Sequence, residues 1–401
     1  MANVSSSNGL EKRPKLRFPG FDEPWEICKA ESLFRNITDK NHPDDTVLTI
    51  VQGKGTLPRD KSGRNIHYDD ASLSNYKRVE KGDFIIHLRS FEGGLEMAHE
   101  TGIVSPAYTI LRCSKPHSSL FYEAYFHTDE FINHALSKAV EGIRDGRQIS
   151  YEAFKWLGIP YCTNAEQEKI SGLFDAINRR IEKQEQIVNA LKKYKRGAVR
   201  YLLSPKSCPL KNARWTTAKL GELGSFVKGA PLSKADISED GTPFILYGEL
   251  YTTYNEVVTS VKRRTQAQVD ELFLSRVGDV VIPTSGETSE EISTASCVML
   301  PGVILAGDLN IFRSDKVDGR IMSYLLNHVV NAKIARIAQG KSVVHIQASE
   351  LGKLTLSYPD ENTQKKLIDF LSKFDDKIVI EENALTFLTG LKEGLMQQLF
   401  I

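Results

Sequence analysis

An internal repeat dominates the pattern of this sequence. The segment from Gln167 to Leu203 matches the segment from Gln364 to Phe400 without a gap, at an offset of 197 positions. Along both copies, apolar residues return at alternating steps of four and three positions, which is heptad spacing. A heptad kept over several periods predicts a long helix with one apolar seam. We therefore expect the chain to contain two copies of one long helix.

The repeat defines two sets of helix-pairing seam residues. They are Ile170, Phe174, Ile177, Ile181, Val188 and Leu191 in the first copy, and Leu367, Leu371, Phe374, Ile378, Leu385 and Leu388 in the second. Both copies interrupt the seam at equivalent places, with Gln184 and Glu381 at one position and Lys195 and Lys392 at another. Because a polar seam residue fixes register, these breaks indicate a shared design. Each helix would extend about 55 Å at about 1.5 Å per residue. The alternative is two ordinary surface helices, each folded onto its own domain.

The sequence between the helices repeats more faintly. Trp25 and Trp215 each open a globular segment, Lys81–Ile86 echoes Val277–Ile282, and Thr109–Arg112 echoes Asn310–Arg313. A Gly-Asp pair before a β-branched run predicts a turn that enters a buried strand. We expect an α+β fold in which two mixed α/β domains alternate with the two long helices. The expected boundaries are a disordered lead over residues 1–16, domains over 17–160 and 205–357, and helices over 161–204 and 358–401.

Composition limits the classes of protein that fit. The 52 basic residues are balanced by 51 acidic ones, so the chain is not coated in positive charge and local basic clusters matter more. The five cysteines show no C-x-x-C and no metal-ligand spacing, which favours free thiols in a reducing compartment. The sequence has no signal-peptide pattern and no apolar run long enough to span a bilayer. We therefore expect a cytoplasmic protein.

Motifs for catalysis are missing from the sequence. Gly340-Lys341-Ser342 resembles the end of a P-loop, but Ala335 stands where that motif needs a glycine. Pro359-Asp360-Glu361 resembles part of a nuclease motif, yet it falls at a predicted helix start, where Asp is a good cap. The sequence contains no H-E-x-x-H pattern and no glycine-rich or Pro-Pro-aromatic motif of an adenine methyltransferase. We expect no catalytic residue, no metal site and no cofactor bound by this chain.

This organisation resembles the specificity subunits of type I restriction-modification enzymes, from Leu16 to Ile401. Three phrases look like family signatures: Leu16–Phe21, Gly102–Tyr108 and Tyr247–Tyr254. The resemblance implies two target-recognition domains and two long helices that pair as an antiparallel coiled coil, with a pseudo-twofold internal repeat. It also implies double-stranded DNA, two methyltransferase subunits and restriction subunits as partners. S-adenosylmethionine would belong to the methyltransferase, and ATP and Mg to the restriction subunit.

Two similar modules on paired helices suit duplex DNA, whose backbone has local twofold symmetry. Because the modules differ in sequence, the expected site has two unlike half-sites and an unread spacer. The expected function is therefore recognition of a bipartite DNA site and scaffolding of two adenine-N6 methyltransferase subunits and the restriction subunit. Two alternatives stay open. One is a coiled-coil scaffold that joins two protein-binding domains, and the other is the specificity subunit of a fused nuclease-methyltransferase system.

Candidate DNA contacts are Lys, Arg and small polar residues near predicted loops, because Lys and Arg bind phosphates and polar side chains reach base edges. In the first domain they are Lys54, Arg59, Lys61, Arg64, Arg89, Ser90, Arg144 and Arg147, and in the second they are Lys228, Lys234, Lys262, Arg263, Arg264, Ser285 and Lys341. A solvated loop is the alternative explanation for each. The segment from Lys192 to Arg214 has eight basic residues and no acidic one. It predicts either a phosphate-binding track or the basic end of a helix with a linker.

Overall fold

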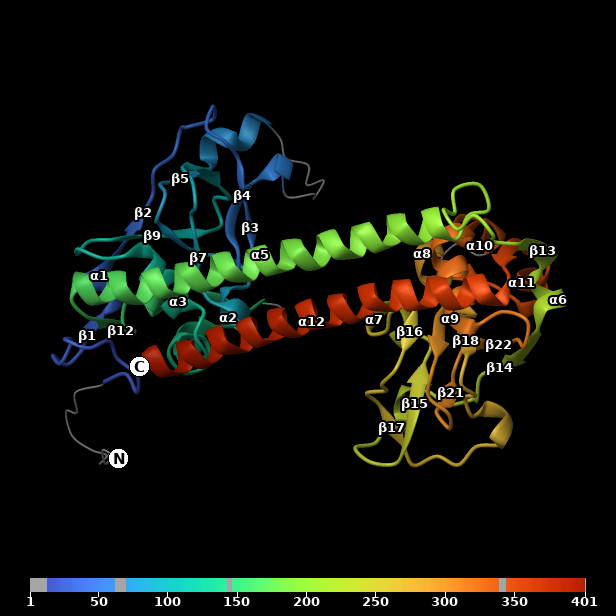
Figure 1. The fold of residues 1–401 in the computed structure, drawn as a ribbon. Helices are drawn as coiled ribbons and strands as arrows, with labels where there is room; N and C mark the ends of the chain where they lie inside the picture. Colours follow the sequence, from blue (N-terminus) through green and yellow to red (C-terminus); the bar gives the residue numbers. More distant parts are fainter. Residues whose placement is uncertain (1–12, 62–69, 143–145, 339–343, 401) are drawn as a thin grey trace. The chain divides into compact units, whose positions relative to one another are not determined.

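The chain folds into two compact units (Figure 1). The computed structural model describes residues 13–61, 70–142, 146–338 and 344–400. Unit 1 comprises Met1–Glu185 and Asn383–Ile401, and unit 2 comprises Gln186–Glu382. Each unit therefore combines one globular part with a portion of each of two long helices.

The two long helices are α5 (Asn164–Leu202) and α12 (Glu361–Leu399), with 39 residues each. Within unit 2, Lys192 and Lys195 of α5 form ion pairs with Glu382 and Asp375 of α12. Because the partner number falls as the α5 number rises, the helices are antiparallel there. This confirms the antiparallel packing of two duplicated helices that the resemblance implied.

The predicted seam residues all lie in the covered faces of these helices. The buried ones are Ile170, Phe174, Ile177, Val188, Leu367, Leu371 and Ile378, and the half-buried ones are Ile181, Leu191, Phe374, Leu385 and Leu388. Two polar members of the seam are buried as well, since Gln184 is 2% exposed and Lys195 is 4% exposed. The heptad therefore marked the packed face of each helix.

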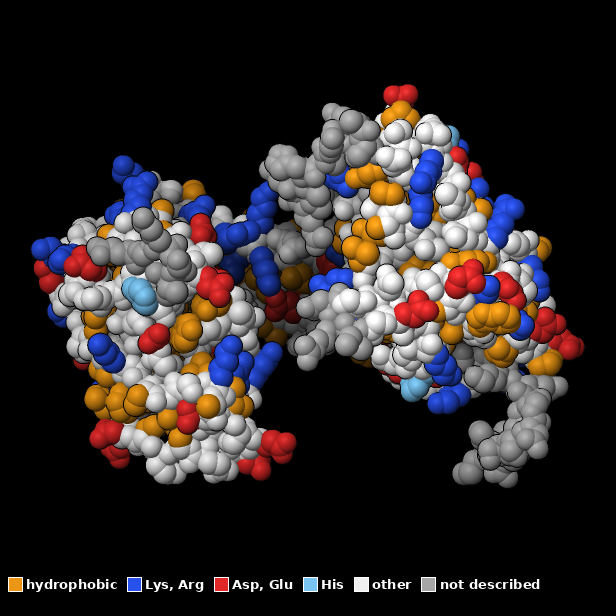
Figure 2. All heavy atoms as spheres, turned by 180° about the vertical axis from the view of Figure 1, so that it is seen from behind, with side chains coloured by type: hydrophobic (Ala, Val, Ile, Leu, Met, Phe, Trp, Pro, Cys, Tyr) orange, Lys and Arg blue, Asp and Glu red, His pale blue; other side chains and the backbone are white. Residues whose placement is uncertain are grey.

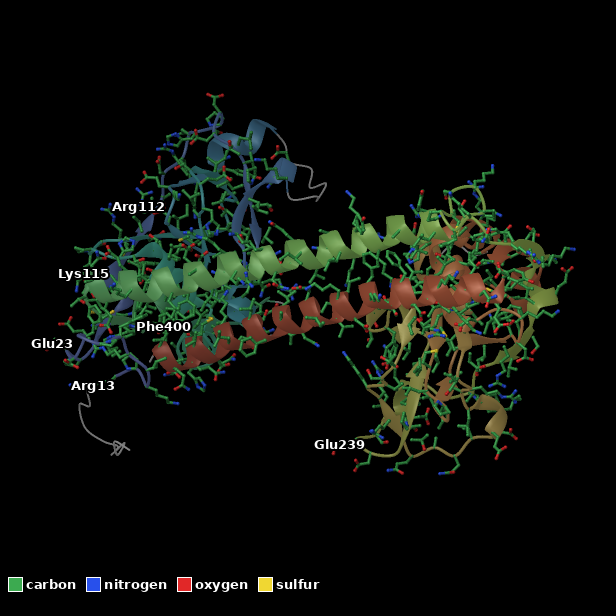
Figure 3. All side chains as sticks on the ribbon, in the orientation of Figure 1. Arg13, Glu23, Arg112, Lys115, Glu239 and Phe400 are labelled. Carbon is green, nitrogen blue, oxygen red and sulfur yellow. The ribbon has the colours of Figure 1, made fainter. Side chains whose placement is uncertain are left out.

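The main sheet of unit 1 has four antiparallel strands in the order β2-β9-β6-β7. Their bounds are Phe34–Ile37, Thr109–Cys113, Phe84–Ile86 and Glu96–Met97. Helix α3 (Ser119–Phe126) adds Phe121, Tyr122 and Phe126 to an aromatic core with Phe34 and Phe84. Phe400, at the C-terminal end of α12, joins this core, with its ring centroid 5.2 Å from that of Phe121 and 5.8 Å from that of Phe174 (Figure 3).

Smaller elements surround the sheet of unit 1. Four two-stranded pairs are β1 (Glu26–Lys29) with β12 (Gly158–Tyr161), β3 (Leu48–Val51) with β4 (Gly55–Pro58), β5 (Lys77–Val79) with β8 (Gly102–Val104), and β10 (Val140–Glu141) with β11 (Gln148–Ile149). Short helical turns include α1 (Ala30–Leu33), η1 (Arg59–Lys61), η2 (Asp70–Asn75), α2 (Ser90–Gly93), η3 (Glu130–Ala135), η4 (Leu136–Ala139) and α4 (Tyr151–Phe154).

Unit 2 is built around a five-stranded sheet in the order β14-β22-β18-β20-β16. Its strands are Ser225–Lys228, Leu309–Arg313, Asp279–Pro283, Ser296–Val298 and Val257–Val258. A three-stranded sheet combines β17 (Arg264–Thr265), β15 (Thr242–Leu246) and β21 (Ile304–Ala306). Two further pairs are β13 (Trp215–Lys219) with β24 (Thr355–Pro359), and β19 (Ser285–Gly286) with β23 (Val344–His345).

The helices of unit 2 outside α5 and α12 are short. They are α6 (Leu220–Leu223), η6 (Lys234–Asp236), α7 (Glu249–Thr252), η7 (Glu271–Phe273), α8 (Ser289–Ile292), α9 (Gly319–Tyr324), η8 (Leu325–Val329), α10 (Asn331–Ile337) and α11 (Ala348–Gly352). The apolar core shared by α6, α8, α9, η8, α10 and α11 includes Val199 of α5 and Leu367 and Leu371 of α12. No helix within the described ranges combines the length and apolar character that a membrane crossing needs.

The two Gly-Asp turns of the sequence repeat adopt the same backbone conformation. Gly82 and Gly278 both have φ of +93°, in the region that favours glycine. Each turn leads into a central strand, β6 in unit 1 and β18 in unit 2, and both strands pair with the second echoed segment, β9 or β22. The predicted turns into buried strands are therefore confirmed.

Each long helix is tied to the domain before it by a buried glutamine in its first turn. The Gln167 Oε1 accepts a hydrogen bond from the Ser118 N–H at 3.0 Å, and its Nε2 donates to the Cys162 carbonyl at 2.9 Å. Gln364 makes the same two kinds of bond, accepting from the Asp318 N–H at 2.8 Å and donating to the Pro359 carbonyl at 2.9 Å. The internal repeat therefore extends to the side-chain contacts that attach each helix.

Candidate DNA-binding interface

Three predicted basic residues of unit 1 lie at and after the β3–β4 hairpin. Lys54 stands at the hairpin tip and is exposed, and Arg59 and Lys61 form η1 directly after β4. Lys61 is exposed, whereas Arg59 is half-buried. Arg64 lies outside the described residues. The structure therefore presents Lys54 and Lys61 to solvent from one continuous segment.

A second group of predicted residues surrounds α2. The Arg89 side chain is 70% exposed and forms an ion pair with Glu92 at 2.7 Å. The Arg147 guanidinium carbon lies 4.3 Å from the centre of the Phe91 ring, a cation–π contact. The structure thus brings Arg89 and Arg147, which are distant in the sequence, to the same short helix. Arg144 lies outside the described residues.

Ser90 does not belong to this exposed group. It has no exposed surface, and its hydroxyl oxygen accepts a hydrogen bond from the His87 N–H at 2.8 Å. Its hydroxyl is engaged in the turn that precedes α2, and its burial removes it from any surface that DNA could reach. The prediction of a DNA contact at Ser90 does not fit the structure.

In unit 2, the predicted lysines Lys228 and Lys234 are both exposed. Lys228 ends strand β14, and Lys234 begins the turn η6. Gly229 between them approaches another loop closely, because a Cβ there would lie 2.6 Å from the Gly307 carbonyl oxygen. The backbone after Lys228 is therefore held against the fold while the lysine faces solvent.

The basic run from Lys262 to Arg264 is divided by the structure. The Arg263 Nε lies 3.1 Å from Oε1 of Glu249, whose side chain is 4% exposed. Lys262 and Arg264 are exposed, and the Arg264 guanidinium donates to the Gly241 carbonyl at 2.9 Å. Two of the three charges therefore face solvent, and the third neutralises a buried carboxylate.

Ser285 is also buried, at 5% exposure. Its hydroxyl donates to the Asp308 carboxylate at 2.8 Å, and its backbone pairs with His345 in the β19–β23 ladder. A hydroxyl engaged in this way cannot read a base edge, so the prediction of a DNA contact at Ser285 does not fit the structure. Lys341 lies outside the described residues.

The basic segment from Lys192 to Arg214 is not a uniform track. Lys195 is buried in ion pairs, Lys192 is paired with Glu382 at 2.6 Å, and Arg200 donates to the His328 carbonyl at 3.0 Å. Lys193 and Arg196 remain exposed. On the face drawn in Figure 2, Lys and Arg side chains are interspersed with Asp and Glu side chains. The exposed charge is therefore local, as the balanced composition indicated.

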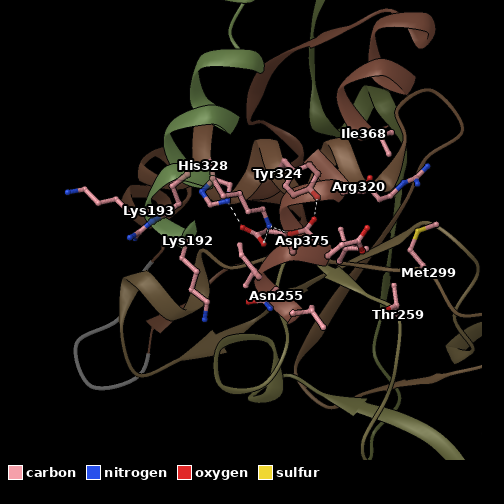
Figure 4. Close-up of a pocket in the computed structure, with 18 of the residues that line it drawn as sticks. Lys192, Lys193, Asn255, Thr259, Met299, Arg320, Tyr324, His328, Ile368 and Asp375 are labelled. Atoms are coloured by element: carbon pink, nitrogen blue, oxygen red, sulfur yellow. Dashed lines mark hydrogen bonds and ion pairs between the residues drawn. The ribbon is translucent and has the colours of Figure 1, made fainter. Parts of the chain in front are cut away.

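The sequence did not reveal the partners of Lys195. Its ammonium lies 2.6 Å from the Glu256 carboxylate, pairs with Asp375 and sits 5.0 Å from the centre of the Tyr324 ring. The Tyr324 hydroxyl donates to Asp375, and His328 contacts Glu256 (Figure 4). This buried ion cluster joins α5, α12 and the globular part of unit 2. The polar break in the heptad was the only sequence signal for it.

The protonation states in this cluster follow from its contacts. Burial raises the pKa of Glu256, but the hydrogen bond with His328 and the charge of Lys195 outweigh it and hold that pKa well below its usual range. Burial lowers the pKa of Lys195, but the charges of Glu256 and Asp375 outweigh it, so the lysine pKa is raised. Burial raises the pKa of Asp375. Lys195 is therefore the positive centre that holds two carboxylates in the fold.

A cavity of about 780 Å³ opens beside the cluster. Its lining includes Asn189, Lys193, Asn255, Thr259, Met299 and Val379.

Among the described residues, no group of three or more His, Cys, Asp or Glu side chains is arranged to hold a metal ion. The five cysteines are free thiols, with Cys162 and Cys297 buried and the others half-buried.

Comparison with known proteins gives matches in family and in fold. Residues 212–389 match the family model described as type I restriction modification DNA specificity domain. The type I restriction-modification system S subunit from M. genitalium is 15% identical, with a TM-score of 0.57 over 97% of this chain and 99% of that chain. A chain from a structure on complex assembly and conformational transition of the type I R-M system is 14% identical, with a TM-score of 0.55 over 96% and 99%. No curated protein sequence matches.

Proposed function

We propose that this protein is the DNA sequence-specificity subunit of a type I restriction-modification system, because residues 212–389 match the family model described as type I restriction modification DNA specificity domain. Each unit reads one half of a bipartite duplex site, and the spacer between the half-sites is unread. The family match is the observation that carries this proposal. The fold shared with a type I S subunit over 97% of the chain supports extending it to unit 1.

The exposed basic residues supply the contacts that this function needs. Lys54, Lys61, Arg89 and Arg147 in unit 1, and Lys228, Lys234, Lys262 and Arg264 in unit 2, are exposed on hairpins, turns and strand ends. Such residues bind phosphates and fix the register of a protein on the duplex, while neighbouring polar groups reach base edges in the major groove. Arg64, Arg144 and Lys341 belong to the same proposed set.

The long helices carry the partner subunits in this proposal. Large apolar side chains are exposed along them, including Tyr194 at 68%, Ile380 at 59% and Phe387 at 69%. Exposed apolar side chains that together form a large patch are typical of a protein–protein interface. We assign these surfaces to two adenine-N6 methyltransferase subunits, which bring S-adenosylmethionine. The restriction subunits bring ATP and Mg, and the chain itself binds no cofactor and performs no chemistry.

The test is methylome sequencing of cells that carry this gene with its neighbouring methyltransferase gene. The measurement is repeated after residues 17–155 are exchanged for those of a related chain. We expect a split adenine-methylated motif in which one half changes while the other half and the spacer persist. A motif that does not change, or no motif at all, favours instead a coiled-coil scaffold that joins two protein-binding domains.

A second assay tests the assignment of the chemistry. The purified chain with S-adenosylmethionine and motif DNA should transfer no methyl group, and transfer should begin when the methyltransferase subunit is added. Methylation by the chain alone would overturn the non-catalytic assignment. The neighbouring genes distinguish a type I system from a fused nuclease-methyltransferase system, because only the first encodes separate methyltransferase and restriction subunits.

A further inference from the structure

A buried carboxylate lies beneath the hairpin that carries Lys54. Glu96 belongs to strand β7, and its side chain has no exposed surface. A charge removed from water in this way destabilises a fold unless hydrogen bonds and opposite charge compensate it. The groups that compensate Glu96 therefore show what this residue is used for.

Two of those groups are backbone amides of the hairpin turn. The Gly53 N–H donates to Oε1 of Glu96 at 2.6 Å, and the Gly55 N–H donates to Oε2 at 2.8 Å. Both glycines have positive φ, +74° and +72°, so the turn curls its amides toward one point. The residue between the two held amides is Lys54, which is exposed. Glu96 thus holds the turn on both sides of the lysine.

The third group is His127, at the end of α3. Its Nε2 lies 3.3 Å from Oε1 of Glu96, and its Nδ1 lies 2.8 Å from the Glu123 carbonyl oxygen. Burial raises the pKa of Glu96, but the bonds from His127, Gly53 and Gly55 outweigh it, so the pKa lies below its usual value. Glu96 is therefore in its ionised form, and its contact with His127 connects it to the end of α3, the helix whose aromatic side chains pack in the core of unit 1.

Steric contacts close the same turn against β7. A Cβ at Gly55 would lie 2.3 Å from the His99 ring and 2.6 Å from the Met97 carbonyl oxygen. The His99 N–H also donates to the Thr56 hydroxyl at 3.1 Å. The hairpin therefore packs closely against the strand that carries Glu96, and no side chain larger than that of glycine fits at position 55.

We propose that Glu96 is a positioning residue for DNA binding, which holds the Gly53–Gly55 turn so that Lys54 meets a backbone phosphate of the half-site read by unit 1. This inference rests on the proposed function. A turn ordered before binding loses less conformational entropy when the complex forms. Removal of the clamp weakens binding by releasing Lys54, and a variant that lacks Lys54 has nothing further to lose.

The test is a double-mutant cycle on the full chain assembled with its methyltransferase subunits. Binding is measured to a labelled duplex with the motif methylated in wild-type cells, and to duplexes with one half scrambled. We expect Glu96→Gln and Lys54→Ala each to weaken binding about tenfold, and the double variant to lose little more than either. Each single variant should also lower the slope of log K against log salt by about 0.9, the value for one phosphate contact. Glu152→Gln, at a 75% exposed glutamate of the same unit, is the matched control.

Independent effects that multiply to about a hundredfold would overturn the inference, because Glu96 would then act without Lys54. So would binding by Glu96→Gln equal to that of Glu152→Gln. Loss of discrimination at the half-site read by unit 2 would show damage to the whole fold and also count against it. If the wild-type complex does not distinguish intact from scrambled duplexes, the proposed function itself fails.

Hydrogen exchange tests the clamp without any substitution. In the wild-type chain, the Gly53 and Gly55 amides should exchange slowly although they lie at a hairpin tip. Exchange at the rate of an unstructured peptide would exclude the clamp, even where Glu96→Gln fails to fold.

Discussion

The Asp83 carboxylate receives two hydrogen bonds of 2.7 Å from the Arg112 guanidinium. Asp83 also accepts the Glu80 N–H at 2.8 Å, so one carboxylate closes the Gly82 turn and joins strands β6 and β9. Unit 2 repeats the relationship, with Asp279 accepting from Arg313 at 3.1 Å and from the Arg276 N–H at 2.9 Å. The same ion pair therefore organises the central strands of both units.

Replacement of either aspartate should destabilise its unit. Asp83→Asn leaves the Arg112 charge without its bidentate partner and should cost about 2–3 kcal/mol, while Asp279→Asn should cost about 3–4 kcal/mol because Arg313 is only 11% exposed. Urea unfolding of the full chain measures both losses. Asp44→Asn, at an exposed position of unit 1, is the control. A loss no larger than that of the control would show that the ion pair contributes nothing to stability.

The long helices and the Gly-Asp turns could be predicted because their signals are local. A heptad records one covered face of a helix wherever its partner comes from, and Gly82 and Gly278 supply a conformation that the turn itself requires. The strands after these turns follow from the same short patterns. The bounds of α5 and α12 accordingly lie within the predicted ranges 161–204 and 358–401.

The burial and the side-chain partners of individual polar residues could not be predicted, because they depend on contacts between distant segments. The Ser285 hydroxyl donates to Asp308, and the Lys195 ammonium donates to carboxylates 61 and 180 positions away. No periodicity links such residues. For the same reason, sequence analysis predicted a DNA contact at Arg263, although Arg263 is paired with Glu249 in the fold.

Two lysines at equivalent positions of the repeat should respond differently to substitution. Lys195→Met leaves Glu256 and Asp375 buried without their cation and should destabilise unit 2 by about 3 kcal/mol or more. Lys392 is half-buried, and burial lowers its pKa, with no ion pair observed for it in the described part of the chain. Lys392→Met should therefore be neutral or stabilising. Thermal unfolding compares the pair, and equal losses would contradict the assignment of Lys195 as the centre of the cluster.

The stability of unit 1 should decrease as pH rises from neutral to mildly alkaline. The hydrogen bond to Glu123 raises the pKa of His99. Burial lowers the pKa of His127, but the bond to Glu96 outweighs it, so this pKa is also raised. A raised histidine pKa contributes stability that is complete below the unfolded value of about 6.5 and is lost as pH rises through the folded value.

The measurement is the melting temperature of the wild type and of the His99→Gln/His127→Gln variant across this pH range. The variant should show a flatter decline. His134→Gln, at a side chain 63% exposed, should keep the wild-type slope. His87 contributes with the opposite sign, because burial lowers its pKa, and its effect falls below the unfolded value of about 6.5, so its replacement should leave the decline at higher pH nearly unchanged. Identical slopes for the wild type and the double variant would contradict the prediction.

Substitutions in the basic run of unit 2 should have different effects: one should lower stability, and the other two should lower the affinity for DNA. Arg263→Ala leaves the buried Glu249 carboxylate without its cation and should cost about 2–3 kcal/mol of stability. Lys262→Ala and Arg264→Ala should change stability by about 0.5 kcal/mol or less, because both side chains are exposed. Each should instead lower the slope of log K against log salt by about 0.9, the value for one lost phosphate contact.

Salt titrations of duplex binding by the assembled complex measure these slopes, and Lys353→Ala, at an exposed lysine of the same unit, is the control. Slopes equal to the control for both Lys262→Ala and Arg264→Ala would remove this run from the DNA interface. A lower slope for Arg263→Ala at unchanged stability would mean that Arg263 leaves Glu249 to bind a phosphate. The run would then exchange an internal ion pair for one with DNA, and the affinity of unit 2 would depend on how strongly Glu249 retains its arginine.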